Sequence, residues 1–378
     1  MPLTLYIHVP WCVAKCPYCD FNSHVAPQVV PERAWRESLI ADLDFELARR
    51  PAASPLAAIF LGGGTPSLLA PETFAALFEQ LAERLDFGET TEITLEANPC
   101  TIERGRFAEY RAAGINRVSL GVQSLDDAML KRLGRIHSAR EAIDAAGELH
   151  AAAIENFNID LMHGLPGQNA AAALSDISQA LALSPAHLSW YELTLEPGTV
   201  FYRRPPNLPD EDDLAAIESA GRAAIVERGY RRYEVSAYAR PGRTCRHNDN
   251  YWCFGDYLGL GPGAHGKRSE AGRIVRTARI RSPTRWQRLA GSDQAVYERE
   301  IAPRERPFEF MLGALRRTGG FTWAEFEART GCRRASIRRT VNGALADGLL
   351  MSADGAVRAT TRGLLFLNEL QERFLPTY

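Results

Sequence analysis

The stretch Leu5-Tyr-Ile-His-Val9, followed directly by Pro10-Trp-Cys12-Val-Ala-Lys-Cys16-Pro-Tyr-Cys19, decides how the rest of the chain is interpreted. The apolar run over residues 5–9 predicts a buried strand, and the three cysteines lie on the loop that follows it. In barrels and doubly wound sheets, ligands bind at the carboxyl ends of parallel strands. Three crowded cysteines at such a position in a reducing compartment predict a metal site.

The cysteine spacing favours one kind of metal site over another. Three thiolates in the pattern CxxxCxxC can wrap a cuboidal iron–sulfur cluster, each binding one iron, which leaves the fourth iron open to a small molecule. The alternative is a tetrahedral zinc ion, with His8, Asp20 or His24 as the fourth ligand. Structural zinc sites usually draw their ligands as two pairs, whereas here three fall within eight residues. The spacing therefore favours the cluster.

Short apolar segments alternate with amphipathic ones from residue 4 to about residue 240. The predicted strands cover residues 5–9, 58–61, 92–97, 117–122, 157–162 and 188–195. The predicted helices cover residues 32–49, 71–85, 101–113, 138–152, 170–183 and 211–228, and several begin at start signals such as Thr101-Ile102-Glu103. Six such units predict an α/β fold whose parallel sheet is curled into a partial (β/α)6 TIM-like barrel or opened as a doubly wound sheet.

The pattern changes after about residue 240. Residues 240–268 are rich in Gly, His, Asn and aromatic residues and predict irregular structure, and residues 271–290 hold six arginines and no acidic residue. From residue 301 on, helices over 321–329 and 334–347, a small β-wing over 348–351 and 356–360, and a helix over 361–374 predict a mainly helical, winged-helix-like domain. We therefore divide the chain into residues 1–238, 239–300 and 301–378.

Composition limits the class of protein further. The chain has 378 residues, of which 46% are hydrophobic and 24% charged, with a formal net charge of −2, as expected for a packed globular protein with about two domains. No apolar run reaches the ~20 residues of a membrane span, and the N-terminus lacks a secretory signal, so we expect a cytoplasmic protein. Seven cysteines in that compartment do not predict a disulfide framework.

The cysteine loop, with Tyr18 before its last cysteine, resembles that of the radical S-adenosylmethionine (SAM) superfamily. The glycine-rich turn Gly62-Gly63-Gly64-Thr65-Pro66 after the second predicted strand resembles the SAM-contacting segment of that superfamily. The resemblance implies a [4Fe–4S] cluster on Cys12, Cys16 and Cys19. It also implies that SAM chelates the open iron through its amino and carboxylate groups.

A series of further motifs, in order, is similar to the coproporphyrinogen III dehydrogenase-like branch of the superfamily. These motifs are Tyr6-Ile-His8-Val-Pro10-Trp-Cys12, Gly62–Pro66, Glu96-Ala-Asn-Pro99, Gly121-Val-Gln123-Ser and Asp160-Leu-Met-His-Gly-Leu-Pro-Gly167. The resemblance implies that Tyr6 and Tyr18 pack or hydrogen-bond at the cluster and SAM, and that Gly63, Gly64, Thr65 and Glu96 contact SAM. Gln123, Arg135 and Asp160 match positions that hold a second SAM. The alternative is structural, with Asp160 capping a turn and Arg135 on a helix surface.

Two departures from the dehydrogenase pattern point to one family within the branch. Phe21 stands where the dehydrogenase has a fourth cysteine, and we expect no N-terminal arm of the kind that encloses its porphyrinogen, because the first strand begins near residue 4. Both features resemble the HemW family, which is regarded as a family of heme chaperones. The distinguishing motif of that family, HNxxYW, is present as His247-Asn248-Asp249-Asn250-Tyr251-Trp252.

The HNxxYW segment suits heme chemistry. An imidazole such as that of His247 can ligate heme iron, and aromatic side chains can stack on the macrocycle. The candidates for that apolar surface are Tyr251, Trp252, Phe254 and Tyr257. The alternative iron ligands are the thiolates of Cys245 and Cys253 and the imidazole of His265, whereas His8 is expected to support the cluster loop. The structural alternative is that His247 caps a loop and the aromatic residues belong to a core.

Three functions follow from these observations. The favoured one is a chaperone that binds a [4Fe–4S] cluster, SAM and heme and passes heme to an acceptor protein, with possible association with membrane heme proteins. The second is a radical SAM enzyme, such as an oxygen-independent coproporphyrinogen III dehydrogenase. The third is a nucleic-acid-binding regulator, but residues 301–378 hold 12 arginines against 8 acidic residues, a net charge of only +4. We therefore expect no nucleic-acid partner.

Overall fold

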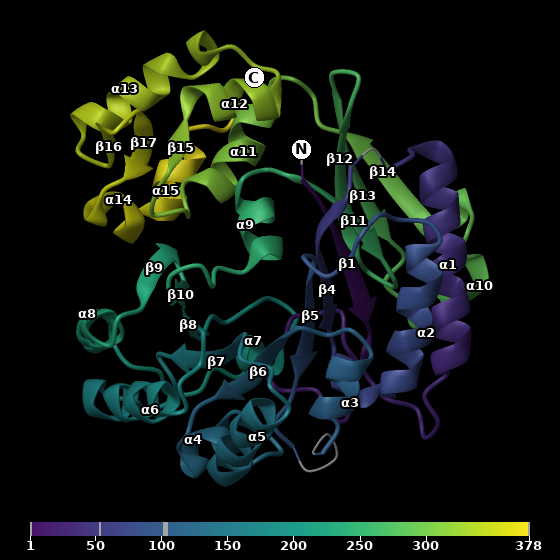
Figure 1. The fold of residues 1–378 in the computed structure, drawn as a ribbon. Helices are drawn as coiled ribbons and strands as arrows, with labels where there is room; N and C mark the ends of the chain where they lie inside the picture. Colours follow the sequence, from purple (N-terminus) through teal and green to yellow (C-terminus); the bar gives the residue numbers. More distant parts are fainter. Residues whose placement is uncertain (1, 53, 101–104, 377–378) are drawn as a thin grey trace.

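The computed structural model describes residues 2–52, 54–100 and 105–376 (Figure 1). Within these residues the chain forms a 12-stranded sheet in the order β14-β13-β12-β11-β1-β4-β5-β6-β7-β8-β10-β9. Neighbouring strands pair in parallel from β1 to β8. These central strands are β1 (Leu3–Val9), β4 (Leu56–Gly63), β5 (Glu92–Ala97), β6 (Arg117–Gln123), β7 (Phe157–His163) and β8 (His187–Glu192). The predicted parallel α/β core is confirmed.

Helices follow each central strand, as the sequence predicts. They are α1 (Glu32–Arg49), α2 (Pro71–Ala82), α3 (Phe107–Ala112), α4 (Asp127–Arg132), α5 (Ala139–Ala151), α6 (Ala170–Ala182), α7 (Val200–Arg203) and α8 (Glu211–Glu227). Figure 1 shows α1 and α2 beside the first strands and α4, α5 and α6 beside β6 and β7. The predicted start of the third helix, at residues 101–103, lies outside the described residues.

The two faces of the central strands differ in polarity. One face packs against the helices in a hydrophobic core that contains Leu5, Ile7, Ile93, Leu95, Val118, Leu120, Ile159 and Leu161. The residues between them are largely polar, and include Tyr6, Glu96, Ser119, Asn158 and Asp160, which line a common cavity. Because successive strand residues point to opposite faces, this alternation gives the curved sheet a polar inner face. The candidate site lies on that face.

The prediction that residues 240–268 are irregular is wrong. This part of the chain forms α9 (Arg246–Trp252), β11 (Asp256–Leu260) and β12 (His265–Glu270), followed by β13 (Arg273–Arg279), α10 (Pro283–Leu289) and β14 (Val296–Glu300). Strand β11 pairs in parallel with β1, so the sheet continues past its first strand. At the other edge, β10 (Ala237–Ala239) and β9 (Arg231–Glu234) extend it beyond β8. The glycines in β11 and β12 weaken the strand pattern of these segments in the sequence, since glycine is depleted in strands.

The C-terminal part has the predicted order of helix, helix, wing and helix. Its helices are α11 (Arg306–Ala314), α12 (Trp323–Thr330) and α13 (Arg338–Ala346). In a small sheet, β15 (Phe321–Thr322), which directly precedes α12, pairs with β17 (Ala356–Ala359), and β17 pairs with β16 (Leu350–Ala353). Thr322 caps α12, and Gly331 ends it in the left-handed conformation that glycine adopts readily. The predicted final helix is broken at Phe366 into α14 (Thr361–Leu365) and α15 (Leu367–Glu372).

None of the helices in the described residues combines the length and the apolar character needed to cross a membrane.

Candidate functional site

The cysteine loop is held in shape by its own backbone. Cys12 ends the short strand β2 (Trp11–Cys12), which pairs in parallel with β3 (His24–Val25) on the far side of the loop. Between them, the Lys15 ammonium donates to the carbonyl oxygens of Phe21 and Ser23 at 3.1 and 3.2 Å. These contacts fold residues 12–25 into a compact loop at the carboxyl end of β1, where the sequence predicts the ligand site.

Polar side chains lie close to all three loop cysteines. The Thr65 hydroxyl donates to Cys12 Sγ at 3.4 Å, the Arg135 guanidinium donates to Cys16 Sγ at 3.6 Å, and Cys19 Sγ lies 3.7 Å from Ser23 Oγ. Among the described residues, no group of three or more His, Cys, Asp or Glu side chains is gathered closely enough to hold a single metal ion. Burial raises the pKa of Cys12, and the charges of Cys16 and Cys19 raise it further, so the three thiols lie near one another.

His8 supports the loop, as the sequence predicts. Its Nε2 lies 3.0 Å from the Asn22 carbonyl oxygen, which can only accept, so Nε2 carries the proton. Nδ1 therefore accepts from the Tyr6 hydroxyl at 2.9 Å. Burial lowers the pKa of His8 to about 4, which keeps the imidazole neutral. Both ring nitrogens are engaged, so His8 is a poor candidate for the fourth ligand of a zinc ion.

The glycine-rich turn after β4 lies directly against the start of the cysteine loop. Gly64 N donates to Val9 O at 2.6 Å, and Thr65 N donates to Trp11 O at 2.7 Å. A Cβ on Gly64 would lie 2.5 Å from Trp11 O, and a Cβ on Gly63 would lie 2.3 Å from the His8 ring. Gly63 also has φ +111°, which a residue with a side chain rarely adopts. Glycine is therefore needed here to bring the turn and the loop together.

A cavity of about 260 Å³ lies inside the curved sheet, below this turn. Its walls are Tyr6, Phe60, Glu96, Arg117, Ser119, Asn158, Asp160, Ser189, His247 and Asn248. Glu96 accepts a hydrogen bond from Gly63 N at 3.0 Å, and burial raises the pKa of its carboxyl group to about 7. Asp160 accepts from Ser119 Oγ at 3.0 Å and from Asn158 Nδ2 at 2.8 Å, and burial raises its pKa as well. Both predicted acids therefore face one buried cavity, where desolvation favours their neutral forms.

Arg135, Gln123 and Tyr18 are brought to the loop side of this face. Besides Cys16, Arg135 donates to Asn98 Oδ1 at 2.5 Å and to the Gly121 carbonyl oxygen at 2.7 Å. Gln123, whose φ is +69°, accepts from the Tyr191 hydroxyl at 2.7 Å. Tyr18 is half-buried and its ring lies 6.4 Å from that of Phe201. The alternative of Arg135 as a surface helix residue is wrong, because the structure buries its guanidinium against Cys16.

The HNxxYW motif forms α9, which closes the inner face of the sheet. Glu92 Oε1 accepts from Arg246 N at 2.9 Å, and Asn250 Nδ2 donates to Thr4 Oγ1 at 3.2 Å and to Asp256 O at 2.9 Å. His247 is buried, with its ring 5.0 Å from that of Phe60 and 6.1 Å from that of Tyr6. Burial lowers its pKa to about 4, and its Nδ1 has no hydrogen-bond partner among the described residues.

The other half of the motif points to a different cavity. Tyr251 and Trp252 line a cavity of about 240 Å³ between α9, the strands β11–β13 and the helices α11 and α15. The Arg316 guanidinium lies 4.5 Å from the centre of the Trp252 ring. The structure therefore separates His247 from the two aromatic residues that the sequence groups with it.

The two alternative thiolate ligands are poor ones. Cys245 is fully buried beside Glu92, and burial raises its pKa to about 12. Burial also raises the pKa of Cys253 to about 11. A protonated thiol must lose its proton before it can bind iron, so both are less favourable ligands than a neutral imidazole.

Comparison with known proteins shows which families this chain resembles. The family model described as the Radical SAM superfamily matches residues 6–178, and the model described as HemN C-terminal domain matches residues 301–366. The protein named heme chaperone HemW of Escherichia coli (strain K12) is 46% identical over 378 residues, which cover 99% of this chain and 98% of that protein. The protein of the same name in Haemophilus influenzae is 45% identical over 379 residues, with the same coverage.

The chain belongs to the HemW family.

Other relatives agree with the fold of this HemW family member. A bovine protein named radical S-adenosyl methionine domain-containing protein 1, mitochondrial, is 37% identical over 383 residues, which cover 97% of this chain and 86% of that protein. The solved structure of coproporphyrinogen III oxidase (HemN) from Escherichia coli superimposes with a TM-score of 0.82 at 21% identity, covering 99% of this chain and 90% of that chain. At that identity the likeness shows a shared fold.

Sequence reasoning missed much of the inner face of this HemW family member. Asn98 links Thr65 to Arg135, donating to Thr65 Oγ1 at 2.9 Å. Three further buried polar residues with contacts on the same face are Arg117, Asn158 and His187. The sequence pattern that could have identified these residues is the alternation of polar and apolar residues along the strands. This alternation indicates a sheet face that does not pack against helices.

Proposed function

We propose that this chain is a heme chaperone that carries a [4Fe–4S] cluster and SAM and transfers heme to an acceptor protein. The observation that carries the proposal is the full-length similarity to proteins named heme chaperone HemW, at 45% and 46% identity. The HNxxYW segment, present as His247–Trp252, adds a specific feature to that similarity. The proposed partners are heme and a heme-accepting protein.

Cys12, Cys16 and Cys19 would hold the cluster. The fit rests on three neighbouring thiols in one loop and on hydrogen-bond donors from Thr65 and Arg135 at two of the sulfurs, since such donors tune iron–sulfur clusters. When bound, the cluster supplies an iron without a protein ligand, at which SAM can bind through its amino and carboxylate groups.

The SAM contacts are proposed along the inner face near the loop. Tyr6, Tyr18, Gly63, Gly64, Thr65 and Glu96 are the proposed contacts of the SAM at the cluster, and Gln123, Arg135 and Asp160 those of a second SAM. Glu96 and Asp160 face the 260 Å³ cavity, and Arg135 lies between that face and Cys16. A cavity lined by Arg117 and by two buried carboxyl groups suits a zwitterionic ligand, whose carboxylate can pair with the guanidinium and whose amino group can accompany the ionisation of a carboxyl group.

His247, Tyr251 and Trp252 are the proposed heme-binding residues of the motif. The neutral imidazole of His247 has the protonation state that an iron ligand needs. Its surroundings are closed, because the 260 Å³ cavity it faces lies below the ~300–1,000 Å³ of cavities that enclose a drug-sized ligand. Binding at His247 therefore requires α9 to move away from Phe60 and Tyr6.

The test is a hemin titration of the protein with its cluster reconstituted anaerobically, followed by ultraviolet–visible spectra. We expect about one heme per chain and a shifted Soret band. His247→Ala should weaken or alter that spectrum while iron and sulfide contents stay unchanged, and His150→Ala, a histidine remote from the motif, is the matched control. A wild-type protein that binds no hemin would contradict the proposed function.

The second candidate function is radical SAM catalysis on a bound substrate. The observation in its favour is the polar cavity below the cysteine loop, with Glu96 and Asp160 in its wall. Turnover of coproporphyrinogen with cluster, SAM and reductant supplied would favour this function over the chaperone.

A further inference from the structure

Two of the three loop cysteines are joined by a chain of hydrogen bonds that runs through Asn98. The Thr65 hydroxyl lies 3.4 Å from Cys12 Sγ and 2.9 Å from Asn98 Nδ2. On the other side, Arg135 Nη2 lies 2.5 Å from Asn98 Oδ1, and Arg135 Nη1 lies 3.6 Å from Cys16 Sγ. The order along the chain of hydrogen bonds is therefore Cys12, Thr65, Asn98, Arg135 and Cys16.

The central position of Asn98 follows from the order of the strands. Strand β5 lies between β4 and β6 in the sheet. Asn98 is the residue directly after β5, and Thr65 lies in the turn after β4. Arg135 donates to the Gly121 carbonyl oxygen of β6 at 2.7 Å. Neighbouring strands are about 4.8 Å apart, so a side chain at the end of the middle strand can reach partners beside both neighbours.

The chemistry of the partners fixes the direction of each hydrogen bond. The Arg135 guanidinium has donors but no acceptor, so the Asn98 oxygen faces Arg135 and the Asn98 amino group faces Thr65. That amino group can only donate, so the Thr65 oxygen accepts, and the hydroxyl proton is left for Cys12. Asn98 thus turns a hydroxyl toward one cysteine sulfur and holds a guanidinium beside another.

This arrangement needs both an acceptor and a donor at position 98. An ionised aspartate would accept from Arg135 but could not donate to Thr65, whose proton would then turn to the carboxylate. A leucine has a similar size and would bond to neither neighbour. The Thr65 backbone is held separately, because Thr65 N donates to Trp11 O at 2.7 Å, so a change at Asn98 acts on the hydroxyl rather than on the turn.

We propose that Asn98 is a positioning residue that raises the reduction potential of the cluster, by directing one hydrogen-bond donor to the sulfur of Cys12 and another to that of Cys16. The proposal rests on the cluster of the proposed function and adds a residue to its surroundings. Reduction adds negative charge to the cluster and its thiolates, so donors at the sulfurs stabilise the reduced state more than the oxidised state. Cys19 lies outside this chain of hydrogen bonds, with its Sγ 3.7 Å from Ser23 Oγ.

The experiment measures the reduction potential of the reconstituted full chain, by an anaerobic redox titration followed by electron paramagnetic resonance. Asn98→Leu removes both hydrogen bonds, and we expect its potential to fall by about 59 mV, the equivalent of a tenfold change in the equilibrium constant of a one-electron couple. Asn116→Leu is the matched control, because Asn116 also bridges two groups, Ile93 N and Thr91 O, but at the opposite end of β5. Its potential should match that of the wild type.

Asn98→Asp provides a second measurement, since it keeps the acceptor for Arg135 and removes the donor to Thr65. Its potential should fall as well, but the added negative charge contributes to that fall. Asn98→Asp is therefore made both in the wild type and in Thr65→Val, which lacks the hydroxyl. The charge acts in both backgrounds, whereas the hydroxyl contributes in only one, so the fall should be smaller in Thr65→Val.

Each outcome decides the proposal. With iron and sulfide contents at the wild-type level, a lower potential in Asn98→Leu and a smaller effect of Asn98→Asp in Thr65→Val support it. If only Asn98→Leu loses the cluster, the comparison in Thr65→Val decides alone. An unchanged potential, or an equal effect of Asn98→Asp in both backgrounds, overturns the proposal and leaves the proposed function intact.

Two further outcomes concern the cluster itself. Loss of the cluster from both Asn98 variants overturns the proposal, because a residue that only orients donors is not needed to bind iron. A wild-type protein that assembles no cluster overturns the proposed function, and this inference with it.

Discussion

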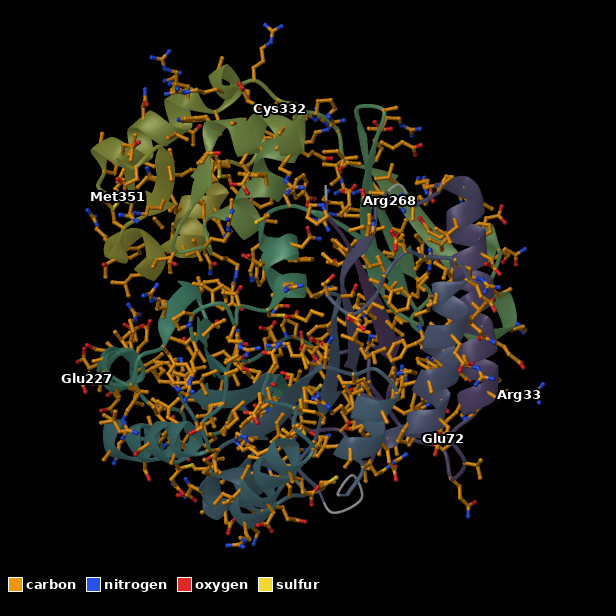
Figure 2. The ribbon with its side chains drawn as sticks, in the orientation of Figure 1. Arg33, Glu72, Glu227, Arg268, Cys332 and Met351 are labelled. Atoms are coloured by element: carbon orange, nitrogen blue, oxygen red, sulfur yellow. The ribbon has the colours of Figure 1, made fainter. Side chains whose placement is uncertain are left out.

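At the scale of single residues, we expect each of the three loop cysteines to be necessary for the cluster. We expect Cys12→Ser, Cys16→Ser and Cys19→Ser each to lose the [4Fe–4S] cluster, because each change removes one thiolate bond to iron. Cys332→Ser is the matched control, since Cys332 lies among the C-terminal helices, where Figure 2 labels it. Iron and sulfide analysis after anaerobic reconstitution measures this. A full cluster in any of the three loop variants would refute the assignment.

Glu96 should make the stability of the SAM-free protein depend on pH. Burial raises its pKa to about 7 from 4.5, so between these values the folded chain keeps a proton that the unfolded chain releases. The folded state is therefore destabilised by the raised pKa of Glu96. This destabilisation is absent below pH 4.5 and reaches its full size above pH 7. Glu96→Gln lacks it, so its free energy of unfolding, relative to wild type, should rise by about 2 kcal/mol between pH ~5.5 and ~7.5.

Urea unfolding at the two pH values tests this prediction for Glu96. Glu72→Gln is the control, because Glu72 is exposed at the surface, as Figure 2 shows. Parallel pH profiles for wild type and Glu96→Gln would show that Glu96 titrates normally.

At the scale of elements, α9 joins the sheet to the C-terminal domain. The Arg316 guanidinium stacks on the Trp252 ring at 4.5 Å and pairs with Glu234 on β9 at 3.1 Å. Gly313 of α11 approaches so closely that a Cβ there would lie 2.7 Å from Trp252 O. Trp252 therefore fixes the position of α11 relative to α9, and α9 carries His247.

Trp252→Ala should weaken this junction. We expect a loss of about 1–3 kcal/mol in the free energy of unfolding, from lost packing and from the lost contact with Arg316. Trp252→Phe keeps a ring under the guanidinium and should recover much of that loss. Denaturant unfolding of the two variants beside wild type measures the effect, and equal stability of all three would exclude a role for Trp252 at the junction.

At the scale of the whole molecule, the fold shared with coproporphyrinogen III oxidase does not by itself predict its activity. We expect no protoporphyrinogen formation, even with cluster, SAM and a strong reductant supplied. The reason is Phe21, which stands at the position of the fourth cysteine of the dehydrogenase pattern and is 60% exposed beside the loop. Product formation above background in an anaerobic assay would make the chain an enzyme of that class.

Local sequence patterns determined the central strands, the helices around them, the cysteine loop and the winged-helix outline. Each of these is encoded by residues close together in the chain: a run of apolar residues, a helix start signal, or cysteines three and two residues apart. The period of two along β5, β6 and β7 also encodes the polar inner face, although that signal is easy to overlook beside the apolar residues of the same strands.

Only the tertiary structure decided where α9 and His265 lie. The pairing of β1 with β11 joins segments about 250 residues apart, as does the contact between Thr4 and Asn250, and no local pattern specifies such a pairing. That pairing places His247 inside the sheet and turns Tyr251 and Trp252 toward the C-terminal domain, while His265 lies exposed on β12. The sequence placed His247, Tyr251 and Trp252 within one short segment, but packing against distant strands assigned them to opposite sides of a helix.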